Sequence, residues 1–188
     1  MIILFSLGFF ILLFIIGLLW ILVPARYGLP PVPTNPNRIR KALQLVNLQP
    51  HEIIYDLGAG DGRVLLIAAR EFNAQAIGIE VGPVQCVLIY LRAAASGFGN
   101  QIQIKWANYL KADLSQADVV FLYATSKEVL KLSKHLEKQM KPGSRLVSIS
   151  AGFPEWQPSN VDEHDLIFIY AMPPKPGSLT TYLLEKSK

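Results

Sequence analysis

The strongest indication of the fold is the stretch Ile53-Ile-Tyr-Asp-Leu-Gly-Ala-Gly-Asp-Gly-Arg63. It begins with an apolar run that is typical of a buried strand, and three alternate glycines then precede an amphipathic helical pattern over Val64–Phe72. Glycine adopts positive φ without steric cost, so the backbone can turn sharply and approach a ligand closely. The helix that follows presents free N–H groups and the positive end of its dipole to that ligand. The stretch therefore predicts a strand, a turn and a helix that bind a nucleotide-like ligand.

The glycine spacing and a preceding acid distinguish between such ligands. Gly62 follows Gly60 by two residues, whereas the dinucleotide fingerprint requires three. Asp56 places an anion where a pyrophosphate would be repelled, and a ligand that carries an ammonium group beside its adenosine fits better. S-adenosylmethionine is such a ligand, and the pattern Asp-x-Gly-x-Gly-x-Gly resembles motif I of the class I methyltransferases. Another nucleotide binder and a purely structural turn are the alternatives.

Downstream, apolar strands alternate with amphipathic helices. The expected strands are Ala76–Glu80, Ile102–Trp106, Val119–Tyr123 and Leu146–Ser150, and the expected helices are Pro83–Ser96 and a helix from the capping box Thr125–Glu128 to about Met140. Leu166–Tyr170 and Thr180–Leu184 flank a Pro-Pro-Lys-Pro-Gly turn that is too short for a parallel crossover, so we expect an antiparallel pair. The sequence predicts an α/β fold, a doubly wound Rossmann-like sheet that ends in an antiparallel hairpin, as class I methyltransferases have.

The chain begins with an uncharged apolar segment. A helix over Ile2–Val23 would be about 33 Å long, enough to cross a bilayer core. No Lys or Arg precedes the segment, it is longer than the apolar part of a signal peptide, and no Ala-x-Ala site follows, so an uncleaved anchor is favoured. We expect a transmembrane helix over residues 1–23, a Pro-rich linker over 24–36 and a methyltransferase domain over 37–188. The prolines predict a stiff linker that isolates the domain from the anchor.

The charged residues and the single cysteine indicate the compartment. Basic residues follow the apolar segment and none precedes it, so the positive-inside rule puts the domain on the cytoplasmic side of a membrane, or on the matrix side in an organelle. One cysteine, Cys86, excludes an internal disulfide and suits a reducing compartment. The net charge of +4 comes without a nucleic-acid-binding motif. It indicates a nearby anionic membrane surface, and no nucleic-acid partner is expected.

The carboxyl ends of the strands should carry the cofactor-binding residues, because open α/β sheets bind ligands there. Glu80 ends the second strand, where its carboxylate can accept hydrogen bonds from ribose hydroxyls or remain a solvated acid. Asn108 and Tyr109 follow the third strand, where such enzymes contact the adenine. Asp61 can touch the methionine ammonium or cap the next helix. The predicted cofactor site is Thr34, Asp56, Gly58, Ala59, Gly60, Asp61, Gly62, Glu80, Asn108 and Tyr109.

The methyl acceptor should enter beside the fourth strand. Methyltransferases that act on adenine or glutamine amides share an (Asp/Asn)-Pro-Pro-(Tyr/Phe) box there, whereas this chain has Tyr123-Ala-Thr125, which argues against those acceptors. Tyr123 can flank an amine by a cation–π contact, or it can be a packed residue at a strand end. The three histidines have neither metal-ligand nor catalytic-triad spacing, so no metal site is assigned.

Several motifs together carry a closer resemblance. Besides the apolar anchor and the glycine motif, the chain has Pro-Thr-x-Pro before a helix, Gly-Ile-Glu with a proline three residues on, and Phe-Pro-x-Trp-x-Pro after the fifth strand. Over Pro24–Met172 it resembles the small membrane-anchored lysine methyltransferases typified by the enzymes that modify the ATP synthase c-subunit and the ADP/ATP carrier. The resemblance implies that Thr34 lies over the methionine end of the cofactor. It also implies that Phe153 and Trp156 wall the acceptor pocket, although a Trp in such a loop can simply be a packing residue.

The resemblance implies a function as well as a fold. The expected reaction is S-adenosylmethionine-dependent methylation of a lysine ε-amine on a membrane protein, with a small molecule, lipid or quinone as the alternative acceptor. Two positions depart from the family pattern, since Asn108 replaces the usual Asp and Gly82 the usual Asn. No general base is evident. The candidates for the acceptor pocket are Tyr123, Thr125, Phe153 and Trp156.

Overall fold

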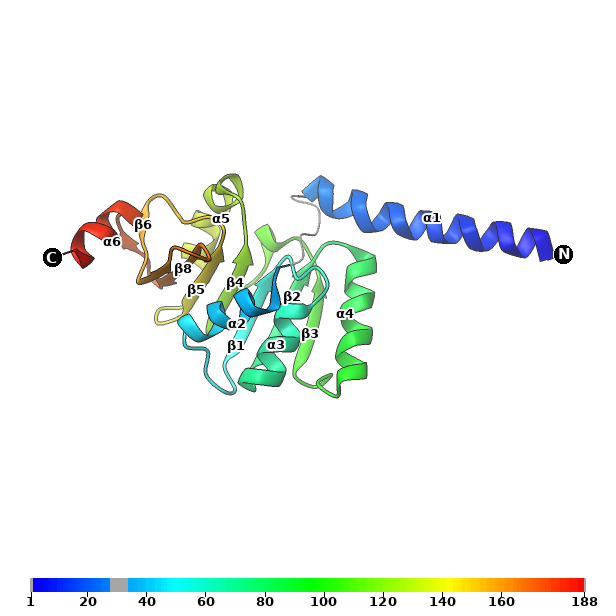
Figure 1. Ribbon diagram of the computed structural model, residues 1–188, viewed down its shortest axis with the longest axis horizontal. Helices are drawn as coiled ribbons and strands as arrows, with labels where there is room; N and C mark the ends of the chain where they lie inside the picture. Colours follow the sequence, from blue (N-terminus) through cyan, green and yellow to red (C-terminus); the bar gives the residue numbers. More distant parts are fainter. Residues whose placement is uncertain (1, 28–33, 188) are drawn as a thin grey trace.

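A mixed seven-stranded sheet forms the centre of the computed structural model, which describes residues 2–27 and 34–187 (Figure 1). The strand order is β3-β2-β1-β4-β5-β8-β7. The first five strands in that order are parallel, whereas β8 is antiparallel to β5 and β7 is antiparallel to β8. The strands are β1 (Ile53–Leu57), β2 (Gln75–Glu80), β3 (Ile102–Trp106), β4 (Val119–Tyr123), β5 (Arg145–Ile149), β7 (Asn160–Asp162) and β8 (Ile167–Ala171).

Helices cover both faces of this sheet, so its central strands are apolar on both sides. On β4, Phe121 faces the core layer under α2, α3 and α4, while Val120 faces the layer under α5. The helices are α2 (Pro36–Leu45), α3 (Arg63–Phe72), α4 (Pro83–Ser96), α5 (Ser126–Gln139) and the short 3₁₀ helix η1 (Tyr109–Lys111). The alternation predicted from the sequence is therefore confirmed, as is the Rossmann-like class.

The strand order changes direction between β1 and β4. These neighbouring strands lead into helices on opposite faces of the sheet, α3 on one side and α5 on the other. Ligands of open α/β sheets bind in the crevice that such a switch point leaves at the carboxyl ends of the strands. Asp56 on β1 and its register partner Phe121 on β4 therefore lie at the base of the expected site.

The antiparallel end of the sheet differs in detail from the prediction. Thr180–Leu184 is not a strand but part of α6 (Leu179–Lys186), which begins with a capping box between Ser178 and Thr181. β8 instead pairs with β5 on one side and, on the other, with β7, which lies directly before it in the chain. A second sheet is formed by β6 (Trp156–Gln157) and β9 (Lys175–Pro176), which pair antiparallel.

The apolar N-terminal segment forms one helix, α1 (Ile2–Tyr27). Its part Phe5–Val23 is long and apolar enough to cross a membrane, with a mean hydropathy of 2.8. The helix includes residues 24–27, which the sequence placed in the linker, and residues 28–33 of that linker lie outside the described residues. Helix α1 crosses the end of α4 and projects past the domain (Figure 1). The Gln85 side-chain amide of α4 donates a hydrogen bond of 2.8 Å to the carbonyl of Trp20, so this end of the helix packs on the domain and is not isolated from it.

Candidate active site

A cavity of about 310 Å³ lies at the carboxyl ends of β1 and β4. It brings together seven of the residues predicted from the sequence, and four others that were not predicted also line it. The predicted residues in its lining are Thr34, Asp56, Gly58, Ala59, Gly60, Asp61 and Tyr123. The others are Trp20, Arg63, Val64 and Phe121.

The glycine turn between β1 and α3 forms one wall of this cavity. Gly60 has a φ of 56° and Gly62 a φ of 78°, a region that side chains other than glycine rarely adopt. Gly62 is also confined by packing, because a Cβ atom there would lie 2.9 Å from Cγ1 of Ile89. Gly58, Ala59, Gly60 and Asp61 of this turn line the cavity, whereas Gly62 lies outside the lining and packs against Ile89.

Asp56 is a buried carboxylic acid without a partner for one of its oxygens. Its Oδ2 atom has no hydrogen-bond partner among the described residues. Burial, reinforced by the negative charges of Glu80 and Asp61, raises the pKa of Asp56 from its ordinary value of 3.8 to about 8. A cationic group in the cavity would stabilise the ionised form and satisfy the free oxygen. This is the chemistry expected of a residue that receives an ammonium group.

Glu80 lies behind the glycine turn and does not belong to the cavity lining. Its Oε2 atom accepts a hydrogen bond of 2.8 Å from Gly60 N, and its Oε1 atom accepts bonds of 2.8 Å from the amides of Val81 and Gly82. A carboxylate offers about four lone-pair positions, so one on Oε2 is left for a ligand. Glu80 therefore holds the turn in place and retains limited capacity to accept a ribose hydroxyl.

Asp61 forms an ionic network that connects the turn to the segment before α2. Its carboxylate receives Arg63 at 2.6 Å and Arg92 at 3.1 Å. Partial burial opposes ionisation, but the hydrogen bonds from both guanidinium groups hold the pKa of Asp61 below its ordinary value. Arg63 also donates a 2.8 Å hydrogen bond to the carbonyl of Thr34. The N-cap position of α3 is Gly62, and the Asp61 carboxylate accepts a 3.3 Å hydrogen bond from Arg63 N at the start of that helix.

Asn108 and Tyr109 lie after β3 and outside the cavity lining. The Asn108 side chain accepts a hydrogen bond from Leu110 N and caps η1. The Tyr109 hydroxyl donates to Glu128 at 3.4 Å, and burial, together with that carboxylate, raises the pKa of Tyr109 to about 12. In this structure both side chains thus have local partners of their own.

Of the four acceptor-pocket candidates, Tyr123 lines the cavity and Thr125, Phe153 and Trp156 do not. The guanidinium of Arg38 lies 5.8 Å from the ring centroid of Tyr123. Thr125 caps α5, with its amide and hydroxyl both donating to Glu128.

Phe153 and Trp156 lie in the core. Their rings stack at 4.3 Å between centroids, and Tyr170 packs against both rings edge-on. These two aromatic side chains fill space between the sheet and the loop after β5, and they do not line the cavity.

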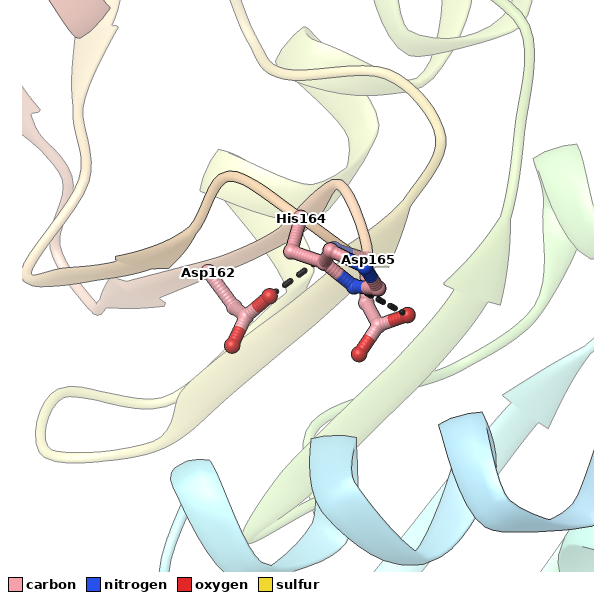
Figure 2. A group of neighbouring side chains, drawn as sticks. All are labelled: Asp162, His164 and Asp165. Atoms are coloured by element: carbon pink, nitrogen blue, oxygen red, sulfur yellow. Dashed lines mark hydrogen bonds and ion pairs between the residues drawn. The ribbon is translucent and has the colours of Figure 1, made fainter.

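One group of side chains outside the cavity has metal-ligand chemistry. Asp162 at the end of β7 lies close to His164 and Asp165 in the turn that leads to β8 (Figure 2). The two carboxylates already share a cation, because Lys41 Nζ lies 2.6 Å from an oxygen of each. These bonds to Lys41 lower the pKa of both aspartates. The group attaches α2 to the sheet, and we assign no metal to it.

Two residues missed in the sequence are central to this geometry. Arg63 directly follows the third glycine of the motif, and this adjacency could have indicated that it lies at the cavity. Trp20 had no such signal, because its place in the cavity depends on how α1 packs against α4.

Comparisons with known proteins agree on the class of protein. The family model described as ANTKMT methyltransferase domain matches residues 56–160, more than half of the chain. A protein-lysine N-methyltransferase of Saccharolobus islandicus is 32% identical over 133 residues, which cover 70% of this chain and 83% of the relative. The human lysine N-methyltransferase of the ATP synthase c-subunit is 25% identical over 76% of this chain, which spans 60% of the human protein.

A solved structure agrees with the expected fold and cofactor. A crystal structure described as an RNA methyltransferase from Salinibacter ruber, in complex with S-adenosyl-L-homocysteine, is 31% identical with a TM-score of 0.74. The match covers 78% of this chain and 97% of that one. The interpretation of the glycine stretch as a methyltransferase motif is thereby confirmed. The chain belongs to the ANTKMT methyltransferase family and is an S-adenosylmethionine-dependent methyltransferase.

Proposed function

We propose that this enzyme methylates a lysine ε-amine of a membrane protein close to the bilayer surface. The proposal is carried by the position of Trp20. This residue belongs to the apolar helix α1, and it lines the same cavity as Asp56. If α1 spans a membrane, the reaction takes place where that helix leaves the bilayer. The lysine-methyltransferase names of the archaeal and human relatives support the acceptor class.

The residues around the cavity suit the cofactor of this family. The orphaned Oδ2 atom of Asp56 can receive the ammonium group of the methionine portion. The backbone of the glycine turn and the N-terminus of α3 can contact the adenosine side, with Glu80 behind them for a ribose hydroxyl. Thr34, held by Arg63, closes the cavity on the side of α2. Asn108 and Tyr109 lie outside the lining, and we propose that they reach the adenine only when the cofactor is present.

The cofactor supplies a methyl group on a positively charged sulfur that a neutral amine can attack. The protein then has to hold the amine in line with the bond between the sulfur and the methyl group, and it has to favour the neutral form of the amine. Lysine begins with a pKa of about 10.4, and a low-dielectric site with a nearby positive charge lowers it. Tyr123 supplies an aromatic wall, and Arg38 over its ring supplies the positive charge. No residue in the lining is assigned as a general base.

The orientation of the enzyme is part of the proposal. The basic residues after α1 favour the cytoplasmic face of a bacterial-type membrane or the matrix face of an organelle. Confinement to that face raises the effective concentration of the site toward membrane-bound acceptors.

Labelled methyl groups identify the acceptor class. The full chain is incubated with S-adenosylmethionine carrying a tritiated methyl group and with membranes, ribosomes and RNA from cells that lack the gene. We expect label in membrane protein, released on acid hydrolysis as methyl-lysine, and none with the Gly60→Val variant. Label that extracts with lipids or quinones would replace lysine by the small-molecule alternative. Label in RNA would contradict the proposal and would match the RNA methyltransferase activity that the Salinibacter ruber protein is named for.

A further inference from the structure

Helix α4 carries an exposed apolar face that no described element covers. Val87, Tyr90 and Leu91 are spaced by three and four residues, so they lie on one side of the helix, and their exposed fractions are 58%, 66% and 58%. Trp106, at the end of the neighbouring edge strand β3, is 72% exposed. Its indole nitrogen donates to the carbonyl of Val81, between β2 and α4, so its ring is held at this edge of the domain. We call these four residues, Val87, Tyr90, Leu91 and Trp106, the α4 face.

Helix α5 shows what an ordinary surface helix of this protein looks like. It has the same length as α4, but its sequence contains four lysines and two glutamates. The sequence of α4 contains one charged residue, Arg92, and that side chain is bound to Asp61. The outward side of α4 is therefore apolar where solvent contact would favour charge.

The position of α1 determines what the α4 face meets. The contact between Gln85 and Trp20 fixes the point at which α1 crosses α4, and the N-terminal part of α1 projects beyond the domain on the same side as α4 (Figure 1). The 18 residues Ile2–Leu19 that precede Trp20 make about 27 Å of helix, close to the hydrocarbon thickness of a bilayer. Trp20 then lies at the membrane interface, where tryptophan is enriched.

We propose that the α4 face docks on the lipid bilayer surface beside the anchor. Helix α4 lies across α1, so a bilayer that α1 spans is parallel to α4 and reaches it at the depth of Trp20 (Figure 1). Tyr90 and Trp106 are amphipathic aromatic residues of the kind that occupy the headgroup level, while Val87 and Leu91 enter the boundary with the acyl chains. This docking holds the cavity at a fixed height above the membrane. It rests on the proposed membrane anchoring.

Spin-label accessibility in the full chain tests the docking and the anchoring separately. The chain, with Cys86 replaced by Ala, is placed in nanodiscs of phosphatidylcholine and phosphatidylglycerol and labelled at a single introduced cysteine. Leu91→Cys and Tyr90→Cys probe the α4 face, and Phe10→Cys probes the anchor. Leu130→Cys on α5 is the matched control, because Leu130 is 60% exposed and lies on the opposite face of the sheet. Collision rates with oxygen, which concentrates in lipid, are compared with those of a water-soluble nickel chelate.

The expected result is a ratio of oxygen to nickel collisions at positions 90 and 91 that is at least threefold higher than at 130 and lower than at 10. If position 10 is in lipid while 90 and 91 match 130, the docking is overturned and the anchor stands. If position 10 is itself accessible to the nickel chelate, the proposed anchoring fails and the docking fails with it. If both reagents are excluded at 90 and 91, a protein partner or a second copy covers the α4 face instead of lipid.

Discussion

Replacing the buried acid Asp56 by Asn tests the physical basis of cofactor binding. The substitution keeps the shape of the side chain and removes its charge. A hydrogen bond to a charged group contributes about 1.5–3 kcal/mol, so S-adenosylmethionine should bind about 10- to 150-fold more weakly at pH 8. The binding partner lost is the orphaned oxygen, Oδ2.

The raised pKa of Asp56 makes the same variant informative about pH. Because the folded-state pKa of about 8 lies above the ordinary value of 3.8, the free protein holds a proton on Asp56 at neutral pH. The contribution of Asp56 to the free energy of unfolding is fully present below pH 4, and it is lost as the pH rises toward 8. The loss is up to about 4 kcal/mol between pH 5 and pH 8. A bound ammonium group favours the carboxylate, so binding at pH 7 should release close to one proton. Cofactor affinity should therefore rise with pH between 6 and 8, by at most about tenfold per unit.

Calorimetry of the full chain in nanodiscs measures both effects. Titrations at pH 6, 7 and 8 in two buffers with different ionisation heats give the affinity and the number of protons released. The protonation of S-adenosylmethionine itself affects wild type and Asp56→Asn equally, so the difference between the two isolates the contribution of Asp56. The variant should therefore lack the part of the pH dependence that comes from Asp56. Asp113→Asn, at an exposed loop acid that accepts a hydrogen bond from Ser115 N, is the control and should match the wild type. Binding by Asp56→Asn within twofold of wild type at pH 8, or an unchanged proton release, would refute the assignment.

Three further substitutions test the walls of the cavity. Glu80→Ala should weaken cofactor binding by about 1.5–3 kcal/mol in the same titrations, because Gly60 N loses its acceptor and the ribose loses its own; an unchanged dissociation constant would exclude Glu80. Gly60→Val should abolish binding while circular dichroism still reports a folded chain, since a branched side chain disfavours a φ of 56° and projects into the cavity; normal affinity would mean that the site is misplaced. Trp20→Ala should weaken binding several-fold and Trp20→Phe much less, because the cavity loses an aromatic wall; equal affinities for both variants and the wild type would separate α1 from the site.

The sequence predicted the sheet well because its strands are short apolar runs between glycine turns and amphipathic helices. It misjudged Thr180–Leu184, where β-branched and aromatic residues favour a strand, but the capping box between Ser178 and Thr181 starts a helix. Strand β7 was missed because three residues with mixed polarity carry no periodic signal. The first pattern was overridden by a local cap, and the second was too short to indicate a strand even though its partner β8 follows directly in the chain.

The site was predictable where its residues share one turn. Asp56, Gly58 and Gly60, which line the cavity, are close together in one sequence motif, whereas Gly62 of the same motif lies outside the lining. The aromatic residues were different, because a Trp in a Pro-rich loop fits a pocket wall and a core equally well, and packing on Tyr170 decides in favour of the core. The predicted isolation of the anchor failed for a similar reason, since the hydrogen bond from Gln85 to Trp20 depends on tertiary packing alone.

Methyl-lysine analysis of membrane proteins tests the proposed function most directly. Membranes from cells with the gene, without it, and complemented with wild type or Asp56→Asn are compared by mass spectrometry. We expect at least one methyl-lysine on a membrane protein, near the bilayer surface, that disappears on deletion of the gene and returns with wild type but not with Asp56→Asn. An unchanged set of methyl-lysines, with a methylated lipid, quinone or RNA lost instead, would contradict the proposed function.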